Sequence, residues 1–231
     1  MSVLVFLDQS DGHIKKSSFE AACYGAKVAE LMGTDANGIL LGTVNDDLAG
    51  LGKYGLKKIY EVKNEALNNF DDEVFTEVIA EAATSAGADV LVFSNNFNGK
   101  AIAPRLSVKL KAGLVSGAVG LPELSNGFVV KKNVFSGKAF ANVSIKSALK
   151  IISLNANAYK VTEGEGTAEV SDLAIAIPQG RVKVKEVNKV EGEIPLSEAE
   201  IVVSGGRGLK GPENWAILTD LAKALGAATA C

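Results

Sequence analysis

The chain has 231 residues, of which 47% are hydrophobic and 22% charged, and its formal net charge is −3. This apolar content excludes a disordered chain, and the slightly acidic balance argues against nucleic acid or an anionic membrane as the main partner. Two cysteines cannot form a disulfide framework, and no apolar run approaches the ~18 residues that a membrane span needs.

The first half of the chain alternates strands with helices. Strands are predicted at 3–7, 36–42, 57–63 and 88–94. Helices are predicted from Ser17 or Ser18 to Met32, from Asp71 to Ala83, and through APRLSVKL with Pro104 in its first turn. Strands that are apolar throughout and alternate with helices are typical of a parallel sheet covered on both faces. Because the first strand opens the chain without a leader, we expect no targeting segment and a cytoplasmic protein, while a processed mitochondrial form stays open.

The pattern changes after Gly113, where strands follow one another with only short turns between them. Asn126-Gly127 and Ser136-Gly137 mark two of these turns. Such spacing leaves no room for crossover helices and predicts an antiparallel extension. Residues 172–187 then predict at least one more strand. The predicted fold class is α/β: a three-layer α/β/α domain with a mostly parallel sheet and an antiparallel extension.

The last thirty residues form a separate pattern of a strand, a glycine turn and a helix. The strand runs from Glu200 to Val203, the turn holds glycines 205, 206, 208 and 211, the helix runs from Pro212 to Leu225, and a second apolar run spans Ala227–Cys231. Gly206, Gly208 and Gly211 have the GxGxxG spacing of a phosphate-cradling turn. We therefore expect residues 1–190 to form one domain. We expect residues 191–231 to form a hinge followed by the first strand and helix of a Rossmann-like nucleotide-binding domain, which is cut off at Cys231.

The turn SGGRG is the strongest candidate for a cofactor site. Gly205, Gly206 and Gly208 allow the backbone to come close to a ligand, and Arg207 presents a permanently charged planar donor among them. A pyrophosphate or an electron-rich ring edge would suit this arrangement. The alternative is a tight turn whose arginine pairs with a neighbouring domain, and we favour the cofactor site.

Three other polar segments are weaker candidates for a binding site. The loop after the first strand carries Asp8, Gln9, Ser10, Asp11 and His13, which would hold a ribose or a phosphate or form a solvated turn; we favour the turn. Lys100 and Arg105 would reach an anion or an acidic partner surface, or simply be exposed at a helix start. The residues Arg181, Lys183 and Lys185 fall on one face of the last predicted strand and are typical of an exposed edge.

The residue types do not provide a catalytic or metal site. His13 is the only histidine, and no nucleophile with its base, no carboxylate pair and no metal-ligand cluster can be assembled from the sequence. We therefore predict no catalytic residue and no metal ligand, and expect a binder or carrier rather than an enzyme. A Rossmann dehydrogenase would rest on the GxGxxG spacing alone and is disfavoured.

Three stretches together resemble the alpha subunit of electron transfer flavoprotein. They are EIPLSEAEIVVSGGRGLKGPENW at 193–215, NGKAIAPRLSVKLKAGLVSGAVGL at 98–121, and KKNVFSGKAFANV at 131–143. The first resembles the junction into the family's flavin domain, and its SGGRGLK followed by Glu-Asn is highly specific. The resemblance spans the whole chain and is strongest from residue 98 onward.

The resemblance implies a heterodimer with a beta subunit, in which a base of two related domains carries a flavin domain. It implies an FAD that accepts electrons from acyl-CoA or other dehydrogenases, as in fatty acid oxidation, and passes them to a quinone oxidoreductase. It also implies that AMP lies in the beta subunit, so that the loop around His13 inherits no nucleotide role. Of the family's flavin contacts, only one is implied to have a counterpart in this sequence, and that counterpart is Arg207.

The chain stops at Cys231, where the family's next flavin contact would follow. We therefore expect a C-terminal part to be missing through a truncated gene, through proteolysis, or because a further domain is not included. We also expect residues 1–231 alone not to hold FAD tightly, because one arginine and a glycine turn do not offset the entropy of association. The alternative function is a nucleotide-binding or structural α/β module that docks a partner without flavin.

Overall fold

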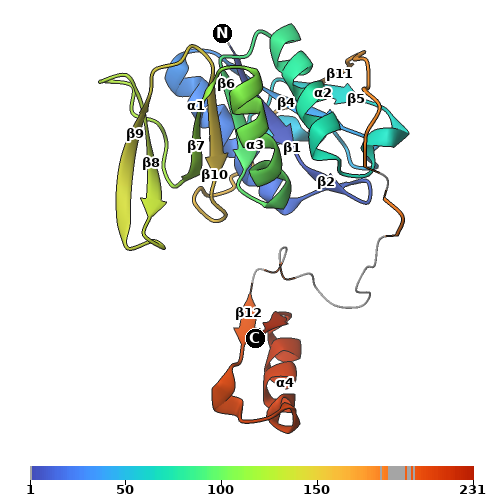
Figure 1. Cartoon of the computed structure of the whole chain (residues 1–231), viewed down its shortest axis with the longest axis vertical. Coiled ribbons are helices and arrows are strands. Elements are labelled where there is room, and N and C mark those ends of the chain that lie inside the picture. The colour runs from blue at the N-terminus through green and yellow to red at the C-terminus, as the bar shows by residue number, and fades with distance from the viewer. Residues whose placement is uncertain (1, 183, 187–195, 197–198, 200) are drawn as a thin grey trace. The chain divides into compact units, whose positions relative to one another are not determined.

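A nine-stranded sheet forms the centre of the first unit, in the order β11-β5-β4-β1-β6-β10-β7-β8-β9 (Figure 1). The parallel strands are β1 (Ser2–Leu7), β4 (Asp35–Leu41), β5 (Lys58–Val62), β6 (Val90–Ser94), β7 (Gly113–Ala118), β10 (Lys150–Leu154) and β11 (Glu169–Asp172). Strands β8 (Phe128–Val134) and β9 (Ala139–Ile145) run antiparallel at one edge. The computed structural model describes residues 2–182, 184–186, 196, 199 and 201–231, and it divides into two compact units, Met1–Lys183 and Val184–Cys231.

Helices cover both faces of this sheet and create two apolar cores. Helix α1 (Lys16–Met32) packs on one face with the 3₁₀ helix η1 (Ala49–Tyr54). Helices α2 (Asp72–Ser85) and α3 (Phe97–Lys109) pack on the other face, near the short η2 (Glu65–Leu67). All six residues of β1 are buried, as expected for a strand covered on both sides. The predicted three-layer α/β/α class is confirmed.

The starts of two helices differ from the sequence-based prediction. Helix α1 begins at Lys16 after Lys15, with no side-chain cap, because the hydroxyl of Ser18 donates instead to the carbonyl oxygen of Asp8 at 2.9 Å. Pro104 lies inside α3 rather than in its first turn, because Asn96 caps the helix earlier and accepts from the amide of Gly99. The expected start of α2 is confirmed, since Asp71 accepts from the amides of Glu73 and Val74.

The antiparallel extension is confirmed for β8 and β9 but not for the strand that follows them. Strand β10 returns to the middle of the sheet and lies parallel between β6 and β7. The chain reverses direction between β8 and β9 at Phe135, Ser136 and Gly137, which all have positive φ. In Figure 1 the hairpin β8–β9 stands out beside β7 and β10.

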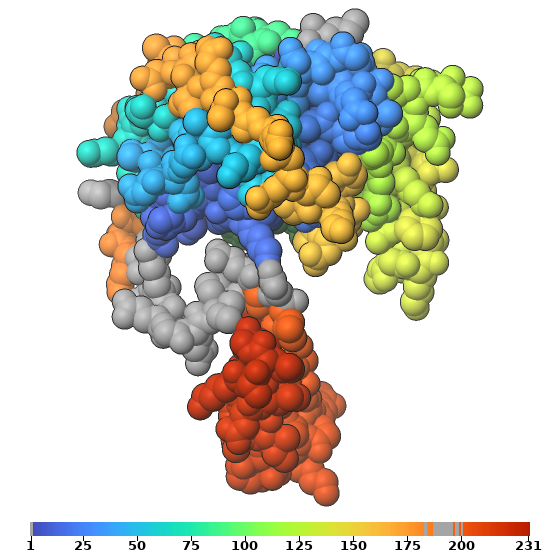
Figure 2. Space-filling view, turned by 180° about the vertical axis from the view of Figure 1, so that it is seen from behind, coloured from blue at the N-terminus to red at the C-terminus, as the bar shows by residue number. Residues whose placement is uncertain are grey.

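A long segment leads from β10 back across the first unit. It covers α1, where the Glu20 carboxylate accepts from the amides of Asn157 and Tyr159, and then joins the far edge of the sheet as β11 (Figure 2). The strand predicted at 172–187 is wrong for the described residues beyond Asp172. The amide of Leu173 still donates to the carbonyl oxygen of Glu61 in β5 at 2.8 Å, and the residues from Ala174 onward are not part of a strand. The side chains of Leu173, Ile175 and Ile177 pack against the core of α2 and α3.

The second unit is a small βαβ arrangement. Strand β12 (Val202–Ser204) pairs in parallel with β13 (Ala228–Ala230), and helix α4 (Ala216–Leu225) connects them after two 3₁₀ turns, η3 (Arg207–Leu209) and η4 (Pro212–Asn214). The predicted strand, turn and helix are therefore present, but the α-helix begins at Ala216 instead of Pro212. The first expected strand residue, Glu200, lies outside the described residues.

Candidate functional site: the turn after β12

The turn after β12 brings together the four predicted cofactor-binding residues. Gly205 continues the strand, since its amide donates to the carbonyl oxygen of Ala230 at 3.0 Å. Gly206 is extended, and Arg207 and Gly208 begin the 3₁₀ turn η3. The side-chain amide of Asn214 donates to the carbonyl oxygen of Leu209 at 2.8 Å, and this bond links η4 to η3. The result is a short, ordered arch between β12 and α4.

The glycines of this arch differ in the space around them. A Cβ atom on Gly205 would lie 2.2 Å from Leu218 Cδ1 and 2.6 Å from Leu209 Cδ1, so this glycine lets the strand end pack closely on α4. A Cβ atom on Gly206 or Gly208 would meet nothing within 4 Å. None of the three glycines has a positive φ. Gly205 is therefore closely packed against two leucine side chains, whereas Gly206 and Gly208 leave open space on the outer side of the turn.

The side chain of Arg207 is exposed and has no hydrogen-bond or ion-pair partner among the described residues, whereas its carbonyl oxygen accepts from the amide of Lys210 at 3.1 Å. The amides of Gly206, Arg207 and Gly208 also donate no hydrogen bond to a described residue. Three backbone donors and a guanidinium, which is always charged, thus lie together without an acceptor. This arrangement can bind an anion or an electron-rich ring edge.

The loop does not have the geometry of a dinucleotide-binding fingerprint. In that fingerprint the glycine turn leads directly into the helix, whose N-terminus receives the pyrophosphate. Here two 3₁₀ turns separate Gly206 from α4, and Lys210 takes a left-handed conformation between them. The GxGxxG spacing at 206, 208 and 211 therefore has a different structural origin, and it gives no support to a Rossmann dehydrogenase.

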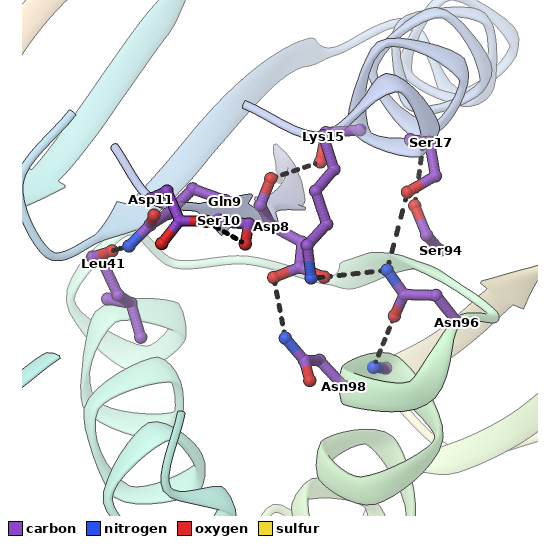
Figure 3. A network of polar contacts seen from close by, with 12 residues as sticks. Asp8, Gln9, Ser10, Asp11, Lys15, Ser17, Leu41, Ser94, Asn96 and Asn98 are labelled. Carbon is purple, nitrogen blue, oxygen red and sulfur yellow. Dashed lines mark hydrogen bonds and ion pairs between the residues drawn. The ribbon is translucent and has the colours of Figure 1, made fainter. Parts of the chain in front are cut away.

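The loop after β1, the second site proposed from the sequence, is filled by side chains of the chain itself (Figure 3). The buried carboxylate of Asp8 accepts from Lys15 Nζ at 2.9 Å, from Asn96 Nδ2 at 2.8 Å and from Asn98 Nδ2 at 2.9 Å. These donors come from the start of α1 and from the turn after β6. The network therefore occupies the point between β1 and β6 where an open α/β sheet usually binds its ligand.

The space that remains beside Asp8 is too small for a nucleotide. The cavity there has a volume of about 20 Å³, enough for roughly one water molecule and far too little for a nucleotide. Gln9 and Ser10 pair with His13 and Ile14 in the small hairpin of β2 (Gln9–Ser10) and β3 (His13–Ile14). These residues form the turn that we expected, whereas the side chain of Asp8 is buried and hydrogen-bonded.

His13 is anchored by an acidic residue from a neighbouring loop. Its Nδ1 lies 2.8 Å from Asp46 Oδ1, and the amide of Ile14 donates to Asp46 Oδ2 at 2.6 Å. The bond from the Ile14 amide, followed by the interaction with His13, lowers the pKa of Asp46 below its ordinary value. These contacts hold the hairpin against the loop at residues 43–47.

The other basic candidates are in part explained by ion pairs. Arg105 reaches Asp72 at 2.7 Å, and Arg181 binds both carboxylate oxygens of Glu73, which holds the pKa of Glu73 below its ordinary value. Lys100 and Lys185 are exposed, and Lys183 lies outside the described residues. Arg105 and Arg181 therefore join α2, α3 and the segment after β11.

The sequence analysis missed the residues that fill the loop after β1. Lys15, Asn96 and Asn98 were passed over, although the run SNN directly after a buried strand was a usable signal, because short polar residues at strand ends tend to cap the next helix. Within the described part of the chain, no group of three or more His, Cys, Asp or Glu residues could hold a metal ion, and no helix is long and apolar enough to cross a membrane.

Comparison with known proteins gives matches over both units. The sequence model of the electron transfer flavoprotein domain matches residues 3–178, and that of the electron transfer flavoprotein FAD-binding domain matches residues 195–231. An electron transfer flavoprotein subunit alpha of Syntrophomonas wolfei is 29% identical over 97% of the chain and 71% of that relative. One from Bacillus subtilis is 26% identical over 98% of the chain and 70% of the relative.

A third relative has a different name. The subunit LctC of a lactate dehydrogenase (NAD(+),ferredoxin) from Acetobacterium woodii is 26% identical over 99% of the chain and 56% of that protein.

Proposed function

The chain belongs to the electron transfer flavoprotein family as an alpha subunit, and on that premise we propose that it pairs with a beta subunit and helps to hold an FAD at the turn after β12. The family consists of electron carriers, so the role of the chain is to position a cofactor that carries electrons between other proteins. We further propose that residues 1–190 form the base that pairs with the beta subunit and that residues 191–231 begin the flavin domain.

One observation carries this proposal. The match to the FAD-binding domain covers residues 195–231, and within that range a guanidinium and three backbone amides have no acceptor among the residues that the structure describes. Binding groups without a partner in the free protein are what a cofactor site would provide. In this reading Arg207 and the amides at Gly206 and Gly208 contact the cofactor, and Gly205 lets the arch pack against α4.

The residues of the arch fit a flavin better than a metal or a bare phosphate. The open space above Gly206 and Gly208 admits a flat ring, and a planar guanidinium can lie against a ring edge. When bound, FAD supplies an isoalloxazine ring that accepts and releases electrons. The permanent charge of Arg207 would stabilise negative charge on that ring and orient it.

The arch alone does not provide a complete site. Only a few donors converge there, and the second unit buries only a small apolar surface, chiefly Leu218, Ala222 and Ala228. Because association costs several kcal/mol of lost freedom, on the order of 4–15, we propose that residues 1–231 bind FAD weakly by themselves and tightly only with further surface from a partner.

Finer features of the function follow from the family resemblance. We propose that electrons come from acyl-CoA or other dehydrogenases and leave to a quinone oxidoreductase or a similar acceptor, that AMP lies in the beta subunit, and that the protein works in the cytoplasm. The filled loop after β1 supports the placement of AMP outside this chain, because Asp8 would repel a phosphate and the cavity beside it is about 20 Å³. The same observation speaks against the alternative of a nucleotide-binding module.

The test is to purify the chain together with the electron transfer flavoprotein beta subunit of the same organism and to record the visible absorption spectrum. The proposal expects a 1:1 complex with bound flavin that bleaches on reduction, and little flavin on the chain alone. A stable 1:1 complex that takes up no flavin even with excess FAD would contradict the cofactor assignment, and the absence of any complex would contradict the pairing.

A further inference from the structure

The charged residues of the chain are distributed unevenly along the sequence. Although the chain as a whole is acidic, the stretch between Glu123 and Glu163 contains no acidic residue. It carries six lysines, at positions 131, 132, 138, 146, 150 and 160. This stretch builds the hairpin β8–β9, strand β10 and the turn that follows it. The hairpin and the segments beside it therefore carry an excess of lysine in an acidic protein, with Glu123 as the acidic residue that pairs with Val129 at the start of β8.

The hairpin also exposes aromatic side chains. Phe140 is 60% exposed and Phe135, in the turn between the strands, is 80% exposed. The Lys131 ammonium lies 4.4 Å from the centre of the Phe140 ring, within the range of a cation–π contact. Lysines alone would be enough to keep an edge of a sheet from aggregating, but exposed phenylalanines would not serve that purpose. Exposed aromatic rings are enriched at protein interfaces relative to the rest of the surface.

A polar groove lies against this face of the hairpin. Its volume is about 450 Å³, and it is lined by Val119, Lys131, Asn133, Phe140 and the turn 155–158. In the ladder, Asn133 stands directly opposite Phe140, so both side chains share one face with Lys131. The Oδ1 atom of Asn133 is buried and has no hydrogen-bond partner among the described residues. This oxygen lines the groove and is therefore in a position to accept a hydrogen bond from a molecule bound there.

We propose that this groove binds an extended acidic segment of the beta subunit. The proposal rests on the heterodimer of the proposed function and adds the surface through which it forms. A backbone N–H of the segment donates to Asn133 Oδ1, a carboxylate of the segment pairs with Lys131, and apolar atoms cover the Phe140 ring. The basic charge of the stretch requires an acidic partner surface, and a groove beside a sheet suits an extended peptide.

A second copy of this chain is a poorer occupant of the groove. In a two-fold symmetric dimer the same patch meets itself, so the lysines of one hairpin would face the lysines of the other. Like charges placed opposite each other in an interface oppose association. The charge pattern therefore favours a different protein with an acidic segment.

The test measures the affinity of the chain for the electron transfer flavoprotein beta subunit of the same organism, by isothermal titration at two salt concentrations. The test variants are Lys131→Glu and Asn133→Leu. The control is Lys57→Glu, which makes the same charge change at an exposed lysine away from the hairpin. We expect Lys131→Glu to weaken binding at least about tenfold, the scale of a lost interfacial charge pair, and Lys57→Glu to leave it unchanged. Circular dichroism and urea unfolding confirm that the variants are folded.

A second readout needs no variant. Hydrogen exchange on the wild-type complex is expected to slow at residues 128–145 and 155–158. If the wild-type chain binds the beta subunit but Lys131→Glu binds equally well and exchange in the hairpin is unchanged, the groove proposal is overturned while the heterodimer stands. If the wild-type chain forms no complex, the pairing itself fails. If the hairpin is instead protected by self-association of the chain, the beta subunit is the wrong occupant.

Discussion

One loop follows the buried strand β1 and another follows β12. The two loops differ in whether their polar groups have hydrogen-bond partners. After β1, the carboxylate of Asp8 is buried and receives hydrogen bonds from Lys15, Asn96 and Asn98. After β12, the side chain of Arg207 is exposed and has no partner among the described residues. Both loops occupy the position where α/β folds bind ligands, so position alone does not identify a site. What distinguishes them is whether the binding groups are already satisfied.

The largest effect is expected from breaking the network after β1. In Asp8→Asn, Lys15 loses its carboxylate, and its side chain is only 26% exposed. We expect the free energy of unfolding of the first unit to fall by about 2–4 kcal/mol, near the lower end of the range for a broken buried pair. Urea unfolding followed by circular dichroism measures it. Glu81→Gln, which makes the same change at an exposed residue, should be within about 0.5 kcal/mol of the wild type. Equal stability of both variants would show that the network is not structural.

The next effect separates the two kinds of glycine in the arch. In Gly205→Ala the new methyl group would meet the side-chain ends of Leu218 and Leu209, so these side chains or β12 must shift, at a cost of about 1 kcal/mol, the low end of the range for overpacking. Gly206→Ala places its methyl group in open space and should not change the packing. Hydrogen exchange at the amides of Gly205 and Ala228, which bond across β12 and β13, reports the difference. Faster exchange in both variants, or in neither, would contradict the assignment.

Removal of the unpartnered cation should change cofactor binding but not stability. Arg207→Ala is expected to weaken FAD binding by the complex with the beta subunit about tenfold, the value of a charge-assisted hydrogen bond of about 1.5 kcal/mol. The variant Lys223→Ala removes an exposed charge from α4 and should retain full affinity. Fluorescence titration of FAD gives both values. If the two variants bind FAD alike, Arg207 has no cofactor role.

The smallest effect concerns the hairpin of β2 and β3. Contacts with the Ile14 amide and His13 lower the pKa of Asp46, so the folded state binds this proton less readily than the unfolded state does. The stabilisation is fully present above the ordinary pKa of aspartate, near 4, and is lost as the pH falls through the lowered value. Because the Asp46 side chain is one third exposed, we expect less than about 1 kcal/mol. Urea unfolding between pH 3 and 7 should show that the free energy of unfolding falls less steeply toward acidic pH in Asp46→Asn than in the wild type. An unchanged slope would contradict the contact.

The elements that the sequence predicted well are those whose pattern depends on burial. The apolar runs at 3–7 and 88–94 became β1 and β6, and Asp71 caps α2 as its position before an apolar periodic run indicates. The position of β10 could not be predicted, because its neighbours β6 and β7 are distant in the sequence and only the packed sheet determines the order of strands. The strand expected after Asp172 was wrong beyond Leu173, because the alternating apolar side chains of Leu173, Ile175 and Ile177 pack against the core of α2 and α3 and their pattern does not require a further strand pair.

The candidate site was predicted only in part, for a related reason. The glycines and Arg207 are adjacent in the sequence, so a local pattern was sufficient to find them. The network around Asp8 combines β1, the start of α1 and the turn after β6, and its partners are up to 90 residues apart. A sequence pattern shows which residues are polar, but only the fold shows which of them are already paired.

Hydrogen exchange of the complex with the beta subunit, with and without FAD, tests the account most directly. The amides of Gly206, Arg207 and Gly208 have no partner among the described residues, so they should exchange quickly without FAD and slowly with it, while residues 8–15 should not change. Protection by FAD at residues 8–15, or no protection at residues 206–208, would contradict the claim that the open turn holds the flavin and the filled loop holds nothing.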